Sequence, residues 1–95
     1  LFPYTTLFRS GGMTAIARGP LLYCVEGADH PDHSTEELLS LRLDPSALCT
    51  EAADDLFPDA VALAGTDGRG RRVRLIPYFL WGNRAPGPMT AFVRT

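Results

Sequence analysis

Two histidines and two aspartates gather in a short stretch of the first half of the chain. The run D-H-P-D-H supplies Asp29, His30, Asp32 and His33 as candidate metal ligands. Imidazole nitrogens and carboxylate oxygens bind Zn²⁺ and related ions. The proline between the two pairs breaks the local geometry, and no regular element is expected to present both imidazoles to one ion. We therefore favour a solvated polar loop over a metal site, and predict no metal in this chain.

Four arginines follow one another closely in the second half of the chain. Arg69, Arg71, Arg72 and Arg74 could meet a polyanion, because clustered cations attract negative ligands. The chain as a whole carries a net charge of −2 at pH 7, so acidic residues elsewhere balance the cluster. We favour a solvated face, and the mild acidity gives no reason to expect a nucleic-acid partner.

An aromatic run near the end of the chain is the third candidate site. Tyr78, Phe79 and Trp81, followed by Asn83 and Arg84, could form a platform on which a sugar ring stacks. The alternative is structural: Trp81 fills the core or packs on a neighbouring domain, while Asn83 and Arg84 fix the corner by hydrogen bonds. We favour the structural alternative. Tyr78, Trp81, Asn83 and Arg84 remain the candidate ligand-binding residues, and we assign no catalytic residue.

Cys24 and Cys49 are the two cysteines of the chain. They could form one disulfide, but two cysteines do not make a disulfide framework. Cys24 lies in an apolar run, where a free cysteine behaves as a small hydrophobic residue. We favour that interpretation.

The first ten residues, LFPYTTLFRS, are the codon-by-codon translation of a common sequencing adapter. We therefore interpret residues 1–10 as foreign to the protein and residues 11–95 as one domain, or part of one. On this interpretation the start of the gene is missing, so the compartment is unknown, although a cytoplasmic location is favoured. A hydrophobic content of 45% and a charged content of 21% fit a globular domain. No apolar run approaches the ~18 residues of a membrane helix, so we expect no membrane partner.

Short apolar runs separated by turn residues predict an all-β fold. The run at residues 21–26 is apolar on both faces and should be a central strand. Asp67-Gly68 should form the tip of a hairpin, and Pro77 marks a bulge or bend. We expect polar loops at 27–37 and 66–70, an irregular segment with about one helical turn at 47–57, and a corner at 82–88. The predicted strands are 13–18, 21–26, 38–43, 59–65, 71–81 and 89–94. Six short strands of this kind indicate an antiparallel, jelly-roll-like β-sandwich.

Two of these segments carry a family resemblance. Residues 15–29, AIARGPLLYCVEGAD, and residues 76–89, IPYFLWGNRAPGPM, resemble the opening and closing motifs of the C-terminal β-sandwich of glycoside hydrolase family 127, the β-L-arabinofuranosidases. The resemblance covers essentially all of residues 11–95, although the middle loops match weakly.

The resemblance implies a parent enzyme that removes non-reducing-end β-L-arabinofuranose with retention of configuration. It also implies a cysteine nucleophile near a zinc ion, with a glutamate as acid/base, in an upstream helical barrel. Cys24 and Cys49 match neither the nucleophile motif nor the ligand motifs, so no catalytic role and no cofactor are assigned to this chain. We expect an accessory domain whose partners are the upstream catalytic and β-sandwich domains of the same chain. A carbohydrate-binding module and an interaction domain that supports a homodimer remain alternatives.

Overall fold

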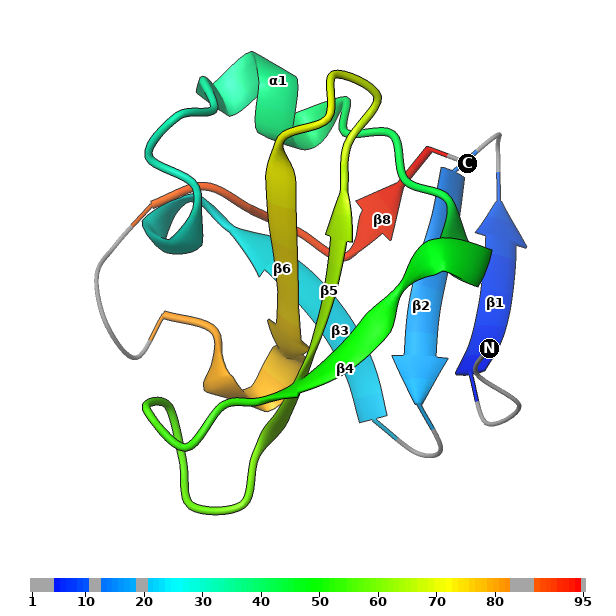
Figure 1. The fold of residues 1–95 in the computed structure, drawn as a ribbon. Helices are drawn as coiled ribbons and strands as arrows, with labels where there is room; N and C mark the ends of the chain where they lie inside the picture. The colour runs from blue at the N-terminus through cyan, green and yellow to red at the C-terminus, as the bar shows by residue number, and fades with distance from the viewer. Residues whose placement is uncertain (1–4, 11–12, 19–20, 83–86, 95) are drawn as a thin grey trace.

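Among the described residues, eight short strands make up most of the regular structure, and every strand pair is antiparallel (Figure 1). The computed structural model describes residues 5–10, 13–18, 21–82 and 87–94. The predicted all-β, sandwich-like fold is confirmed. The strands are β1 (Thr5–Ser10), β2 (Met13–Arg18), β3 (Leu21–Glu26), β4 (Cys49–Ala52), β5 (Val61–Thr66), β6 (Arg72–Pro77), β7 (Met89–Thr90) and β8 (Phe92–Val93).

The strands follow the order β1-β2-β3-β6-β5-β4, with β7 paired to β3 and β8 paired to β2. In Figure 1 the strands β6, β5 and β4 cross in front of β3 and β2, so the sheet folds over on itself. Strand β3 contacts β2, β6 and β7, which confirms its predicted central position.

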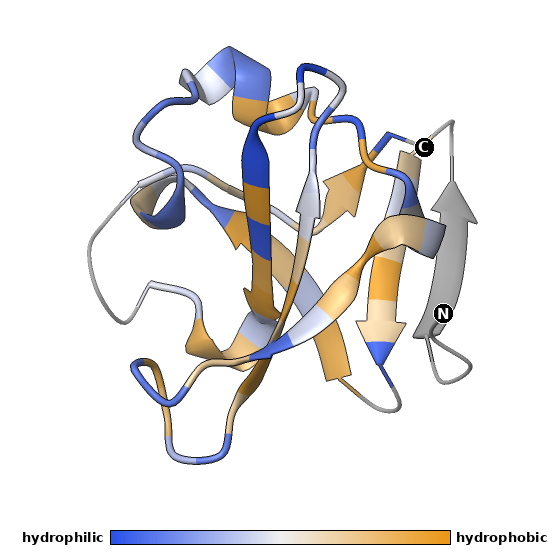
Figure 2. Ribbon diagram, viewed as in Figure 1, coloured by the Kyte–Doolittle hydropathy of each residue, from blue (hydrophilic) through white to orange (hydrophobic). Residues whose placement is uncertain are grey.

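Apolar side chains pack on both faces of β3. Tyr23 and Val25 lie in the larger core cluster, whereas Cys24 points the other way into a smaller one. Strand β6 alternates hydrophilic and hydrophobic bands, as expected for a strand with one face in the core (Figure 2). The larger cluster contains Ile16, Tyr23, Val25, Leu38, Leu41, Leu43, Leu48, Leu63, Val73, Leu75 and Val93, and the smaller contains Cys24, Ala53, Ala62, Ile76 and Leu80.

Residues 38–43 do not form the strand that their alternating leucines predict. The short helix α1 (Thr35–Leu39) occupies the first part instead, and Leu39 is 47% exposed. Ser34 begins the helix: its hydroxyl accepts the Glu37 N–H at 3.1 Å, and the Glu37 carboxylate accepts the Ser34 N–H at 2.9 Å. This reciprocal capping box favours a helical turn over an extended strand.

The segment 47–57 contains a strand that the sequence does not indicate. A 3₁₀ helix, η2 (Pro45–Ala47), precedes β4, and β4 pairs with β5 from Cys49↔Ala64 to Ala52↔Val61. No side chain of β4 is fully buried. An edge strand of this kind has no hydrophobic alternation, so only its pairing with β5 identifies it.

The long strand predicted at 71–81 ends at Pro77. A 3₁₀ helix, η3 (Tyr78–Leu80), follows it, so the alternation does not continue to Trp81. The last predicted strand, 89–94, is likewise divided into β7 and β8. Between them the Thr90 hydroxyl bonds both the N–H and the carbonyl of Phe92, at 3.1 and 2.8 Å.

Strand β1 lies at the edge of the sheet and pairs with β2 along its whole length, from Thr5↔Arg18 to Ser10↔Met13. This pairing does not test where residues 1–10 come from, and their foreign origin stays a prediction. In the part of the chain that the structure describes, no helix is long and apolar enough to span a membrane.

Candidate functional site

The carboxylate of Asp67 organises the tip of the β5–β6 hairpin, where the sequence predicts a turn. Its Oδ1 accepts the backbone N–H groups of Arg69 and Arg71, both at 2.9 Å. Its Oδ2 accepts from Arg71 Nε at 3.1 Å and lies 2.8 Å from His33 Nε2. Burial raises the pKa of Asp67, but the backbone N–H of Arg71, the His33 imidazole and the other donors outweigh that effect and lower it to about 2. The ionised carboxylate therefore fixes the hairpin.

His33 and Asp67 form a buried pair that resembles part of a catalytic triad. Their side chains are only 2% and 4% exposed. A triad also requires a nucleophile on the second ring nitrogen. The other nitrogen, His33 Nδ1, is buried and has no hydrogen-bond partner among the described residues. The pair therefore activates no hydroxyl or thiol in this geometry.

Glu37 extends this group of charges to helix α1. Its Oε2 pairs with Arg69 and Arg71, each at 3.1 Å. The Ser34 N–H, and after it Arg71, lower the pKa of Glu37 to about 2. Glu37, in turn, raises the pKa of Arg71. We call His33, Glu37, Asp67, Arg69 and Arg71 the hairpin cluster.

A second group of charges surrounds Arg74 on the exposed side of β6. Its guanidinium holds the Asp55 carboxylate with two hydrogen bonds, at 3.0 and 3.2 Å. It also lies 3.0 Å from Glu51 and 3.7 Å from Asp29. Asp55 raises the pKa of Arg74, while Arg72 pairs with Glu51. Arg69 and Arg72 remain exposed, as predicted for a solvated face, and all four arginines pair with acids of the same chain, which leaves little positive charge for a polyanion.

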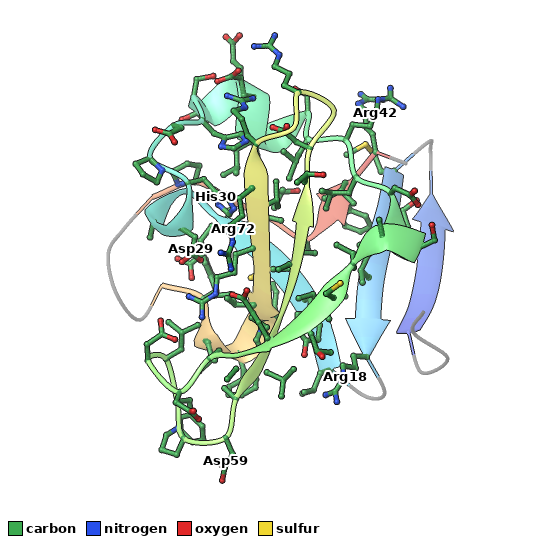
Figure 3. All side chains as sticks on the ribbon, viewed as in Figure 1. Arg18, Asp29, His30, Arg42, Asp59 and Arg72 are labelled. Atoms are coloured by element: carbon green, nitrogen blue, oxygen red, sulfur yellow. The ribbon has the colours of Figure 1, made fainter. Side chains whose placement is uncertain are left out.

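His30 lies beside β6, near Asp29 (Figure 3), and is 3% exposed. Its Nε2 lies 3.0 Å from the backbone nitrogen of Arg74, and its Nδ1 lies 2.6 Å from the carbonyl oxygen of Glu26. The Arg74 N–H can only donate, so Nε2 is the acceptor and Nδ1 carries the proton. His30 is therefore a neutral structural residue.

These contacts correct the prediction of a solvated loop for D-H-P-D-H. Both histidine side chains are buried, and their rings meet edge to face with centroids 5.3 Å apart. Local sequence does not predict this burial, because the contacts to Asp67 and Arg74 come from residues 34 and 44 positions further along the chain. Both nitrogens of His30 and one of His33 are occupied by protein groups. Among the described residues, no three His, Cys, Asp or Glu side chains are grouped so that they could hold a metal ion.

A shallow cleft of about 360 Å³ lies between the D-H-P-D-H loop and β6. Its walls include His30, His33, Glu51, Arg71 and Arg74. The ion pairs described above already use the charged groups of these walls. The cleft therefore offers few uncommitted groups to a ligand.

The aromatic run lies on the surface, which excludes one of the two structural alternatives for Trp81, burial in the core of this chain, and leaves the other, packing on a neighbouring domain. Trp81 is 45% exposed, and Tyr78 and Phe79 are 42% and 57% exposed. Phe57, from the β4–β5 connection, joins them: its ring meets Phe79 edge to face, with centroids 6.2 Å apart. The rings of Tyr78 and Trp81 also have centroids 6.2 Å apart, with an angle of 35° between their planes. We call Phe57, Tyr78, Phe79 and Trp81 the aromatic face. Asn83 and Arg84 lie outside the described residues.

Neither cysteine is part of a disulfide. Cys24 is fully buried in the smaller core cluster, which confirms its predicted role as a small hydrophobic residue. Cys49 is exposed on β4, and its thiol lies 3.9 Å from the carbonyl oxygen of Ala47.

These features define a small all-β domain whose ionisable groups are largely committed to its own fold. The chain belongs to glycoside hydrolase family 127: the model of the "Glycoside hydrolase family 127 C-terminal domain" matches residues 6–94. The match begins inside the segment that we predict to be foreign.

Comparison with known proteins agrees with this family. The chain is 29% identical to the non-reducing end β-L-arabinofuranosidase of Bifidobacterium longum subsp. longum over 87% of its own length, but covers only 16% of that protein. It superposes with a TM-score of 0.74 on the crystal structure of a GH127 β-L-arabinofuranosidase from Geobacillus stearothermophilus T6, at 25% identity, covering 95% of this chain and 18% of that one. A structure described as a glycoside hydrolase shares the fold, with a TM-score of 0.72, 23% identity and coverage of 95% and 19%. The chain thus spans about a sixth of the length of the curated relative that it matches.

Proposed function

We propose that this chain is the non-catalytic C-terminal domain of an enzyme that removes non-reducing-end β-L-arabinofuranose, and that it stabilises the catalytic part of that enzyme. The substrate class rests on the family membership and on the activity named for the Bifidobacterium relative. The zinc ion and the cysteine nucleophile implied by the family would then belong to the rest of the enzyme.

One observation carries the non-catalytic role: the buried acid, base and nucleophile groups among the described residues serve the fold. Asp67 receives four donors at the hairpin. Both nitrogens of His30 bond backbone groups, and Cys24 is fully buried. A catalytic group must reach substrate, and these groups are turned toward the protein.

The test is a set of substitutions in the complete enzyme, assayed on a chromogenic β-L-arabinofuranoside. Asp67→Asn should lower the melting temperature but leave kcat/KM of the folded fraction unchanged within about twofold. Cys49→Ser, at an exposed position, should change neither quantity. A variant of either kind that kept its melting temperature and lost about a hundredfold in kcat would refute the non-catalytic role.

A carbohydrate-binding module is the second candidate, because exposed aromatic rings are what such a module presents to a sugar. Tyr78 and Trp81 fit this description. The same rings would also suit a contact with another protein surface.

A further inference from the structure

The aromatic face is exposed because of the local geometry after Pro77. A 3₁₀ helix has three residues per turn, so Tyr78 and Trp81 lie on one side of η3. Leu80 points into the smaller core cluster and is 3% exposed. With Leu80 turned inward, the three aromatic residues around it are left on the surface.

The aromatic face carries no charge and borders a groove. Residues 77–82, PYFLWG, contain no acidic or basic side chain. A groove of about 220 Å³ runs beside Phe57 and Phe79, with Leu21, Val61 and Pro77 among its lining residues. Figure 3 shows Arg18 and Asp59, which also line it, at the same end of the molecule. Two pairs of exposed aromatic rings beside an apolar groove are typical of an interaction site, since aromatic residues are enriched in the cores of protein interfaces.

We infer that the aromatic face docks on the upstream part of the same polypeptide, an inference that rests on the proposed structural role. The chain covers only 16% of the Bifidobacterium protein and 18% of the Geobacillus structure, so in these relatives more than four-fifths of the polypeptide lies elsewhere. That remainder is covalently attached and therefore present at high effective concentration.

A sugar is the poorer occupant of this surface. Sugars are recognised through several directed hydrogen bonds in addition to ring stacking. The aromatic face offers the Tyr78 hydroxyl and the Trp81 indole N–H, while Phe57 and Phe79 offer only carbon. A flat apolar surface of this composition matches another protein surface better than it matches a polyhydroxylated ring.

Hydroxyl-radical footprinting of the complete enzyme tests this inference. Each side chain is compared with itself in the urea-unfolded enzyme. Docking predicts that oxidation of the four aromatic residues falls about tenfold or more, because an interface core excludes water. For side chains that remain uncovered, the oxidation rate should fall only about twofold, as their exposed fractions imply. Phe92 and Leu39, which are 44% and 47% exposed, serve as these comparators. Protection of about tenfold, unchanged by dilution and without ligand, supports the inference.

Three results would overturn it. The aromatic face could oxidise at about half its unfolded rate, as its exposure in this chain alone implies. Protection could arise only when an arabinofuranoside is added, which would identify a sugar site. Protection could disappear on dilution, which would identify a second copy of the chain as the occupant. Failure here is separable from failure of the proposed function, because the kinetic assay on Asp67→Asn does not involve the aromatic face.

Discussion

His30 joins two strands through its two ring nitrogens: Nε2 accepts the backbone N–H of Arg74 at 3.0 Å, across 44 positions of sequence. The same ring donates from Nδ1 to the carbonyl of Glu26, 2.6 Å away, at the end of β3. The imidazole therefore bonds a backbone acceptor of β3 and a backbone donor of β6.

Replacing His30 with leucine should lower the free energy of unfolding by about 1–3 kcal/mol, because a buried N–H and a buried carbonyl lose their partners. Asp32→Ala, at an exposed position of the same loop, is the matched control and should have little effect. Urea denaturation followed by circular dichroism measures both. Equal midpoints for the two variants would show that His30 does not fasten the loop.

Stability should fall when the pH drops from about 4 toward 2. In the folded chain the pKa values of Asp67 and Glu37 are lowered to about 2 from ordinary values of 3.8 and 4.5. A group with a lowered folded-state pKa stabilises the fold above its unfolded pKa, and this contribution is lost as the pH falls through the folded value. Melting temperatures measured from pH 6 to 2 should therefore decline mainly in the acid part of this range. Asp67→Asn removes one of the two groups and should flatten the decline, and a profile as steep as that of the wild type would contradict this account.

Ser34→Ala should destabilise α1 by about 1 kcal/mol, since it removes the hydroxyl that accepts the Glu37 N–H. Loss of the cap should also leave the Glu37 side chain less firmly positioned for its ion pairs with Arg69 and Arg71. Thr35→Ala, one residue later and exposed, is the control. In hydrogen exchange, the N–H of Leu38, which bonds the Ser34 carbonyl at 2.9 Å, should lose protection only in the Ser34 variant.

Gly27 is a position where a methyl group does not fit. A Cβ added there would lie 2.9 Å from two ring carbons of Pro88, and the Gly27 N–H donates to the Pro88 carbonyl at 2.9 Å. The proline ring cannot move aside without disturbing this bond, so Gly27→Ala should cost about 1–3 kcal/mol. Gly68→Ala is the matched control, because nothing lies within 4 Å of its added Cβ. Chemical denaturation should separate the two variants, and equal stability would mean that the segment around Pro88 yields easily.

Local sequence signals predicted the β-rich fold and its central strand. The apolar run at β3 is buried on both faces, and Asp67-Gly68 does form the hairpin tip. These features depend on neighbouring residues: side-chain alternation sets the faces of a strand, and Asp-Gly suits a tight turn. The capping box from Ser34 to Glu37 was also visible in the sequence, but the leucine alternation at 38–43 obscured it.

Tertiary structure decided which polar residues are buried and which aromatic residues are not. The local sequence predicts that His30 and His33 lie in a polar loop, yet both side chains are buried. Each bonds a residue of the β5–β6 hairpin that is distant along the chain. The sequence left Trp81 either in the core or against a neighbouring domain, and one turn of 3₁₀ helix after Pro77 directs Leu80 into the core in its place. Short-range patterns report the periodicity of a segment, whereas burial depends on what the rest of the chain brings against it, and only the packed fold supplies those partners.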